Sequence, residues 1–270
     1  MIAFQGEPGA YSEQAIFDYF GEAETYPCES FDAVFESVAS NVCEVALIPI
    51  ENSLAGSIHQ NYDLLLRYNL HIVGEHFLRV RHCLISLPGI EKKDIRRVIS
   101  HPQALSQCAA YLRALAVKVE PEYDTAGSVK ILKDSGDRMT AAIASRRAAD
   151  IYGMQILEEG IEDNAENYTR FLAIQREPVT TNGEAKTSIV FTLKNQPGAL
   201  FKALSVFALR DIDLTKIESR PLQGQPWDYL FYVDFIGAAH EEKVRRALEH
   251  LSELALMLRV LGSYPRSVSQ

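Results

Sequence analysis

The sequence lacks the features that mark several large classes of protein. No apolar run approaches the ~18–20 residues of a membrane-spanning helix, and the N-terminal segment has neither the basic region nor the apolar run of a secretory signal. Acidic residues are in excess, 36 Asp and Glu against 27 Lys and Arg, and the net charge is −9. This charge argues against a nucleic-acid-binding surface. The sequence therefore predicts a cytoplasmic protein with no membrane or nucleic-acid partner.

Cysteine is also scarce, and no motif for a metal or nucleotide is present. The four cysteines (Cys28, Cys43, Cys83 and Cys108) are too far apart for a CxxC pair, so we expect buried thiols in a reducing compartment. The seven histidines form no HExxH motif, and neither a P-loop nor a GxGxxG fingerprint occurs. We expect no metal and no cofactor.

What the sequence does contain is an ordinary globular composition, 47% hydrophobic and 23% charged over 270 residues, which is enough for two or three domains. Up to about residue 180, short β-branched runs alternate with helical periodicity. This pattern predicts two α/β lobes, about 1–78 with 168–180 and 79–167, with crossovers at 70–87 and 168–175. We expect a two-lobed, periplasmic-binding-protein-like body that holds its ligand between the lobes, near the carboxyl ends of the strands.

The pattern changes after a linker predicted at 177–186, where proline, threonine, asparagine and glycine gather. Strands are expected at 187–193, 214–219, 230–236 and 257–261, with helices around Leu204 and Leu248. The order β-α-β-β-α-β predicts a ferredoxin-like module over 187–264.

Small polar residues occupy four junctions where a strand is expected to lead into a helix, at 5–12, 51–57, 100–103 and 144–145. Helix N-termini carry free N–H groups and partial positive charge, so convergent ones bind carboxylates or phosphates. Such residues also serve simply as caps and turn formers. A further cluster, at 167–171, places Thr169 beside Arg170, and an arginine is well suited to binding a carboxylate. The same residue types are also typical of an ordinary edge strand. Spacing alone does not choose between these alternatives.

Several ordered motifs resemble those of bacterial prephenate dehydratases along essentially the whole chain. They are Gly9-Ala10-Tyr11-Ser12, Pro49-Ile50-Glu51-Asn52-Ser53, Ser100-His101-Pro102-Gln103-Ala104-Leu105 and Asn167-Tyr168-Thr169-Arg170-Phe171. In the C-terminal module, Pro197-Gly198-Ala199-Leu200 and Glu218-Ser219-Arg220-Pro221 are similar to the two signatures of the family's regulatory ACT domain.

The resemblance implies a lyase that converts prephenate to phenylpyruvate, water and carbon dioxide in phenylalanine synthesis and is inhibited by L-phenylalanine. It implies the monofunctional form, without a chorismate mutase domain. Two alternatives remain open at this point: an arogenate dehydratase, and a non-catalytic binding protein linked to an ACT domain.

The resemblance also implies a set of site residues. Thr169 would donate a hydrogen bond to the departing hydroxyl, Arg170 would bind a carboxylate, and Glu51 is a candidate acid. Catalysis is thus expected from Thr169, Arg170, Glu51 and Asn52, and substrate binding from Ser53, Ser100, Gln103, Gln107 and Phe171.

For L-phenylalanine the expected residues are Asn195, Pro197, Gly198, Ala199, Leu200, Glu218, Ser219 and Arg220. Pairing of ACT domains would give a homo-oligomer, a dimer or tetramer. The plain alternative is that Gly198 only starts a helix and Glu218 only pairs with a charge.

Overall fold

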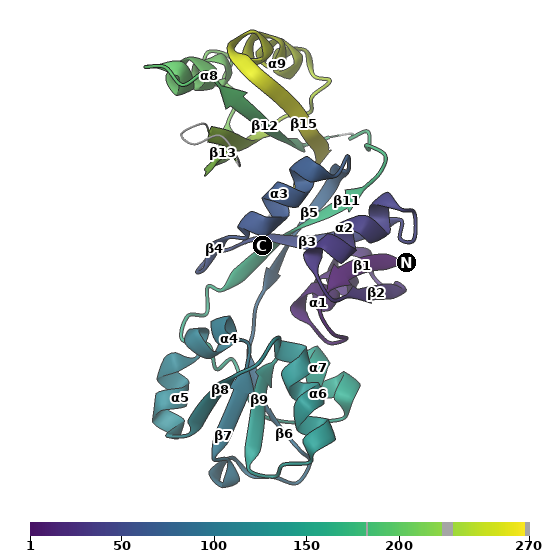
Figure 1. Ribbon diagram of the computed structural model, residues 1–270, viewed down its shortest axis with the longest axis vertical. Coiled ribbons are helices and arrows are strands. Elements are labelled where there is room, and N and C mark those ends of the chain that lie inside the picture. The colour runs from purple at the N-terminus through teal and green to yellow at the C-terminus, as the bar shows by residue number, and fades with distance from the viewer. Residues whose placement is uncertain (182, 223–228, 268–270) are drawn as a thin grey trace. The chain divides into compact units, whose positions relative to one another are not determined.

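The computed structural model describes residues 1–181, 183–222 and 229–267 (Figure 1). Residue 182, in the predicted linker, lies outside the described residues. Strands and helices alternate as expected, so the predicted mixed α/β class is confirmed. The chain divides into two compact units, Met1–Tyr68 with His76–Phe171, and Asn69–Glu75 with Leu172–Gln270. The domain boundaries at 180 and 187 and the limits of the lobes stay predictions.

The first sheet of the chain is mostly buried. Its strand order is β2 (Thr25–Cys28), β1 (Ile2–Gln5), β3 (Val45–Asn52), β11 (Tyr168–Gln175) and β5 (His71–Arg79), and the short β4 (Gly56–Ser57) pairs with β3. Helices α1 (Tyr11–Phe20) and α2 (Phe31–Ala39) lead from one parallel strand to the next, and α3 (His59–Arg67) follows β4. The core of β3 is fully buried, as a continuous apolar run predicts.

The second lobe repeats the arrangement with a sheet of its own. The order is β10 (Gln155–Glu159), β6 (Cys83–Ser86), β9 (Thr140–Ala144), β7 (Arg97–Ser100) and β8 (Lys118–Pro121). Its helices are η1 (Lys92–Asp94), α4 (Pro102–Gln107), α5 (Ala109–Leu115), α6 (Thr125–Ser135) and α7 (Arg146–Tyr152). β7 runs parallel to β8 and β9, whereas β6 is antiparallel to β9. The carboxyl ends of the parallel strands lead into α4, α6 and α7, which sets the edge where a ligand can bind.

The periodicity of residues 103–115 predicts one helix, but the structure has two helices that meet at Cys108. The backbone of Cys108 leaves the helical region, with φ −115° and ψ 22°, and its side chain is fully buried. The carboxylate of Asp163 accepts the backbone N–H of Ala110 at 3.0 Å, which caps α5 separately. A cap from a residue far along the chain leaves no trace in the local periodicity.

The extended stretch predicted over 70–87 is also two elements, because β5 and β6 belong to different sheets.

Two strands, β2 and β10, were not predicted. Both lie at sheet edges, and β2 contains Pro27 while β10 is only partly buried. Edge strands tolerate proline and need no apolar alternation, so the usual signal is weak there.

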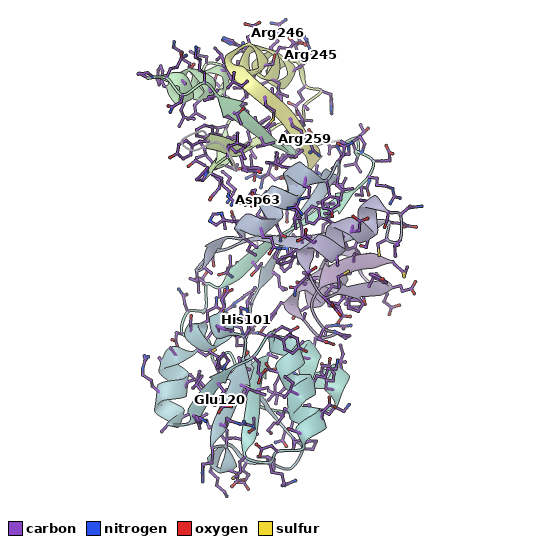
Figure 2. The ribbon with its side chains drawn as sticks, viewed as in Figure 1. Asp63, His101, Glu120, Arg245, Arg246 and Arg259 are labelled. Atoms are coloured by element: carbon purple, nitrogen blue, oxygen red, sulfur yellow. The ribbon has the colours of Figure 1, made fainter. Side chains whose placement is uncertain are left out.

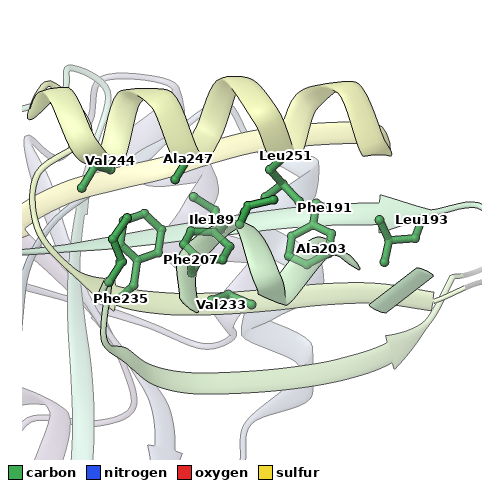
Figure 3. Close-up of a cluster of buried hydrophobic side chains, with 12 residues drawn as sticks. Ile189, Phe191, Leu193, Ala203, Phe207, Val233, Phe235, Val244, Ala247 and Leu251 are labelled. Atoms are coloured by element: carbon green, nitrogen blue, oxygen red, sulfur yellow. The ribbon is translucent and has the colours of Figure 1, made fainter. Parts of the chain in front are cut away.

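The C-terminal module has the predicted β-α-β-β-α-β order. β12 (Ala185–Leu193), α8 (Ala199–Ala208), β13 (Leu214–Pro221), β14 (Tyr229–Ile236), α9 (Glu242–Leu254) and β15 (Ala255–Pro265) form an antiparallel sheet of order β13-β14-β12-β15 with its helices. Figure 3 shows the two helices packing on the sheet through Phe207, Val244 and Leu251, all fully buried. This packing confirms a ferredoxin-like module.

The segment 69–75 packs within the same unit as this module. The ammonium group of Lys186 lies 2.7 Å from the carboxylate of Glu75, and both side chains are buried. A Cβ atom at Gly262 would lie only 2.0 Å from the carbonyl oxygen of Ile72, so glycine is required there. Only a residue without a side chain allows two backbones to approach this closely.

Three further observations come from all the described residues together. All four cysteines are buried, as predicted. Across residues 1–181, 183–222 and 229–267, no helix is long and apolar enough to cross a bilayer. In those same ranges no group of three His, Cys, Asp or Glu residues is placed to hold a metal ion.

Candidate functional site

A cavity of about 310 Å³ in the first unit receives side chains from both lobes. This volume suits a small metabolite. Its polar lining consists of Tyr11, Ser12, Asn52, Ser57, His82, His101, Gln103, Gln107, Thr125 and Thr169. Its apolar lining consists of Pro49, Ala55, Gly56, Ile58, Val80, Ala104 and Phe171. None of the described lining residues is Lys, Arg, Asp or Glu.

Helices begin at this cavity from several directions. Tyr11 and Thr125 are the first residues of α1 and α6, and Ile58 directly precedes α3. His101, labelled in Figure 2, precedes the shorter α4. The first N–H groups of a helix have no partner within the helix and carry partial positive charge. Several such ends around one cavity favour a ligand with carboxylate groups.

The side chain of Asn52 has one fixed orientation. Its Oδ1 atom accepts the backbone N–H groups of Leu54 at 3.1 Å and Ala55 at 2.9 Å, so the amide nitrogen must face the other way. That nitrogen lies 3.0 Å from Thr169 Oγ1. Because an amide nitrogen can only donate, Thr169 accepts this hydrogen bond. The Thr169 hydroxyl proton is then available to a ligand in the cavity.

A second network joins three lining residues: Tyr11 at the start of α1, His82 between β5 and β6, and Gln107 at the end of α4. The Tyr11 hydroxyl lies 2.8 Å from His82 Nδ1, and His82 Nε2 lies 2.9 Å from Gln107 Oε1. Burial lowers the pKa of His82 from its usual 6.5, although Gln107 and Glu162 act in the opposite direction. Burial also raises the pKa of Tyr11 well above its usual 10, with smaller contributions from Cys83, Cys108 and Glu162. Both groups are therefore neutral at pH 7.

The structure brings five of the nine expected catalytic and substrate-binding residues to this cavity: Asn52, Gln103, Gln107, Thr169 and Phe171. Arg170 does not line it. Successive side chains of a strand point to opposite faces, so Thr169 and Phe171 share the cavity face of β11 and Arg170 lies on the other, 5% exposed. Arg170 therefore does not line this cavity, and its role in catalysis stays a prediction.

The same alternation applies to Glu51, which precedes Asn52 on β3. Its side chain lies on the opposite face of the strand from Asn52 and does not line the cavity. The two serines expected to bind substrate, Ser53 and Ser100, instead donate hydrogen bonds to backbone carbonyls. Ser53 Oγ donates to the carbonyl of Glu166 at 2.8 Å, and the fully buried Ser100 donates to the carbonyl of Ile143 at 2.6 Å. None of these three residues lines the cavity, and their roles in catalysis and substrate binding stay predictions.

Sequence reasoning assigned no role to Tyr11, His82, His101 or Thr125. Tyr11 and His101 lie within motifs at two of the four junctions, so a signal for them existed. His82 had none, because a single histidine in an extended stretch has no partner nearby in sequence. His101 Nδ1 accepts the backbone N–H of Gln103 at 3.2 Å and so caps α4.

A smaller cavity of about 120 Å³ lies in the C-terminal module, at the loop before α8. It is lined by Leu193, Lys194, Asn195, Gln196, Ala199, Leu200, Tyr229 and Phe231. Three of the residues expected to bind L-phenylalanine are among them. Pro197 and Gly198 lie in the same loop without lining the cavity, and Gly198 takes the left-handed conformation with φ +79°. Glu218, Ser219 and Arg220 lie on β13, an edge strand, and do not line it either.

Comparisons with known proteins agree with this arrangement. A family model for prephenate dehydratase matches residues 2–179, and one for the ACT domain matches residues 187–253. The chain is 53% identical to arogenate dehydratase/prephenate dehydratase 2 of Arabidopsis thaliana, over 98% of this chain and 72% of that protein. It is 49% identical to arogenate dehydratase 2 of Petunia hybrida, over 98% and 71%.

Two solved structures are similar over nearly the whole chain. Prephenate dehydratase from Arthrobacter aurescens in complex with L-Phe has a TM-score of 0.90 and 32% identity, covering 98% of this chain and 89% of that one. A protein described as a novel type of quorum quenching acylase has a TM-score of 0.92 and 38% identity, covering 98% of each chain.

Fold, site and comparisons together define a dehydratase of the lyase type, with a two-lobed α/β body and an ACT domain. The chain belongs to the prephenate dehydratase family. One expectation is overturned by the relatives. Several of those from Arabidopsis thaliana are described as chloroplastic, which contradicts the predicted cytoplasmic location.

Proposed function

We propose that this protein removes water and carbon dioxide from prephenate to give phenylpyruvate, in the route to L-phenylalanine. The observation that carries this proposal is the directed hydroxyl of Thr169 in a cavity where several helices begin. The side-chain carboxylate of prephenate, which stays on the product, is met by helix N-termini, and the ring hydroxyl by Thr169.

The reaction needs little from the protein beyond positioning and one good hydrogen-bond donor. The bond from the ring to its carboxylate breaks, and the electron pair moves into the ring as carbon dioxide leaves. The carbon–oxygen bond opposite breaks at the same time, and the departing hydroxide takes a proton from the solvent to become water. The ring becomes aromatic, so the substrate itself supplies the driving force.

Thr169 assists the departing hydroxide. Negative charge develops on that oxygen as its bond to carbon breaks, and a preorganised donor stabilises this charge more than it stabilises the ground state. Asn52 fixes the direction of the donor by occupying an acceptor position of the Thr169 oxygen. The Thr169 hydroxyl donates throughout and does not need to ionise.

The negative charge of the departing carboxylate, in contrast, should not be stabilised by the protein. A cation beside it would hold the charge that must leave, and would slow the loss of carbon dioxide. The apolar side chains of Ile58, Val80 and Phe171 in the cavity wall, and the lack of charged side chains among its described lining residues, suit this step.

Arogenate is the second candidate substrate, because several similar relatives are named as arogenate dehydratases. Arogenate carries an ammonium group where prephenate carries a keto group. No carboxylate side chain among the described lining residues is present to pair with that ammonium group, and this favours prephenate. Neutral acceptors such as Gln107 are present, so arogenate turnover at lower kcat/KM is consistent with the site.

The acylase similarity suggests amide hydrolysis as a further candidate. Acyl transfer needs a nucleophile activated by a base. Both ring nitrogens of His82 are engaged by Tyr11 and Gln107, and His101 Nδ1 is engaged by the Gln103 backbone. This arrangement favours dehydration.

We also propose that the ACT domain binds L-phenylalanine and that two copies pair through it. The similar Arthrobacter aurescens enzyme was solved with L-Phe. The loop at Asn195 and the start of α8 offer N–H groups to a carboxylate, beside an apolar cavity. If β13 of a second copy lies against this 120 Å³ cavity, its Glu218 and Arg220 would add a further wall. The space enclosed for the ligand would then be larger.

The experiment that tests the catalytic proposal is steady-state turnover of prephenate and arogenate side by side, with an N-acyl amide as a third substrate. We expect kcat/KM for prephenate to equal or exceed that for arogenate, with no amide hydrolysis. Preference for arogenate by more than tenfold would assign the second function. Turnover of neither would favour a binding protein without chemistry.

A further inference from the structure

The chain of hydrogen bonds from Tyr11 through His82 to Gln107 has more than one way to place its protons. His82 is 2% exposed, and its two ring nitrogens contact residues on two different helices. The Tyr11 hydroxyl has a second acceptor within reach, the carbonyl oxygen of Arg81 at 2.9 Å. A neutral imidazole carries one proton, so one ring nitrogen donates and the other accepts.

In the first arrangement the proton lies on His82 Nε2. This nitrogen donates to Gln107 Oε1, and the Tyr11 hydroxyl donates to His82 Nδ1. The Gln107 amide then turns its NH₂ group away from the ring. The cavity wall presents a hydrogen-bond donor, which suits a carboxylate or keto oxygen.

In the second arrangement the proton lies on His82 Nδ1. It donates to the Tyr11 oxygen, and the Tyr11 hydroxyl donates to the Arg81 carbonyl. The Gln107 amide makes a half-turn, so that its NH₂ group donates to His82 Nε2 and its oxygen turns away from the ring. The wall now presents an acceptor, which suits an ammonium group. Each arrangement satisfies its ring nitrogens, and no charge enters the buried network.

We propose that Gln107 determines whether the cavity accepts a keto acid or an amino acid, and that His82 and Tyr11 act as positioning residues that set the direction of its amide. The inference rests on the proposed function, since prephenate and arogenate differ in this group alone. It assigns a role to His82, for which the motifs gave none. It also explains how one neutral cavity can serve both substrates.

The sharpest test exchanges Gln107 for glutamate and compares the two substrates. A carboxylate keeps the size of the side chain and the bond from His82, but it presents only acceptor oxygen to the cavity. We expect Gln107→Glu to raise the ratio of kcat/KM for arogenate over prephenate by about tenfold or more, the scale of one hydrogen bond to a charged group. Gln103→Glu is the matched control, because Gln103 lines the same cavity away from His82. An equal shift of the ratio in both variants would overturn the proposal.

A second variant tests the positioning role. His82→Leu leaves the Gln107 amide without a fixed direction, so kcat/KM should fall about tenfold for both substrates. In the Gln107→Glu background the same His82→Leu change should cost clearly less, because the two oxygens of a carboxylate are equivalent and need no orientation. A purely structural role for His82 predicts equal losses in both backgrounds, and that result would overturn it.

The tautomer can be observed directly by ¹⁵N NMR of the histidine ring, using Thr169→Ala so that bound substrate is consumed more slowly. We expect Nε2–H with prephenate and Nδ1–H with arogenate. The same tautomer with both ligands would overturn the switch while leaving the proposed function intact. Conversely, a wild-type enzyme that binds both ligands and turns over neither would overturn the proposed function alone, and one that binds neither would overturn both.

Discussion

The side-chain nitrogen of Asn52 lies 3.0 Å from Thr169 Oγ1, while the oxygen of the same amide is held by two backbone N–H groups. This relationship joins β3 to β11 and decides the direction in which the Thr169 hydroxyl can donate. The same nitrogen also lies 2.8 Å from Asn167 Oδ1, so the contact is part of a buried polar network. The proposed chemistry depends on this direction more than on the acidity of any group.

Removing the hydroxyl should therefore abolish most of the chemistry. Thr169→Ala is expected to lower kcat by about 10²–10³, the usual loss for one preorganised donor, with an unchanged fold. Steady-state kinetics and circular dichroism check this. Thr169→Ser, which keeps the hydroxyl, should retain most of the rate, and near-wild-type turnover in the alanine variant would remove Thr169 from the mechanism.

The role of Asn52 can be separated from its packing. In Asn52→Asp the side chain keeps its size but offers only acceptor oxygen, so the Thr169 hydroxyl would turn towards Asp and away from the substrate. We expect kcat to fall about 10- to 100-fold with a much smaller change in KM. An equally large rise in KM with unchanged kcat would show that Asn52 binds the ground state instead.

Stability should fall at mildly acidic pH because of one buried and one half-buried histidine. Burial lowers the pKa of both His82 and His76 from 6.5, so below that pH the unfolded chain binds more protons than the folded one. The free energy of unfolding should then decrease as the pH falls from 7 to 5, by at most ~1.4 kcal/mol per pH unit for each group. Urea unfolding across this range should show a shallower slope in His82→Leu. An unchanged slope would contradict the assignment.

The buried pair of Glu75 and Lys186 gives a stability prediction for the second unit. Lys186→Met leaves the Glu75 carboxylate buried beside an apolar side chain and should cost about 3–5 kcal/mol of unfolding free energy. Replacing both residues, as in Glu75→Leu with Lys186→Met, should recover most of that loss. Chemical denaturation measures both. A single variant as stable as the wild type would mean that the pair contributes little.

The regulatory proposal is tested at the start of α8. Gly198 has φ +79°, and a Cβ atom built there meets nothing within 4 Å, so Gly198→Val strains only the local backbone. We expect the L-phenylalanine concentration for half-inhibition to rise at least tenfold. Gly136→Val imposes a similar strain at the end of α6, with φ +62° and equally open space, and should leave that concentration unaltered. Equal effects would place the regulatory site elsewhere.

Much of this molecule could be predicted because its local patterns agree with its tertiary structure. The buried run in β3, the strand 168–175 and the order of the C-terminal module all followed from periodicity. The position of Arg170 outside the cavity follows from the same pattern: once 168–175 is a strand, Thr169 and Arg170 lie on opposite faces. The Tyr11–His82–Gln107 network could not be predicted, since its members lie 71 and 25 residues apart in sequence. Only the packing of the two lobes brings them together.

The central claim is that the Thr169 cavity carries out a decarboxylating dehydration, and the most direct measurement follows both products at once. Prephenate is supplied to the wild-type enzyme, and carbon dioxide and phenylpyruvate are quantified over the same time course. The account predicts a one-to-one yield at a rate that falls at least 10²-fold in Thr169→Ala. Phenylpyruvate formation at an equal rate in both proteins, or none in the wild type, would contradict it.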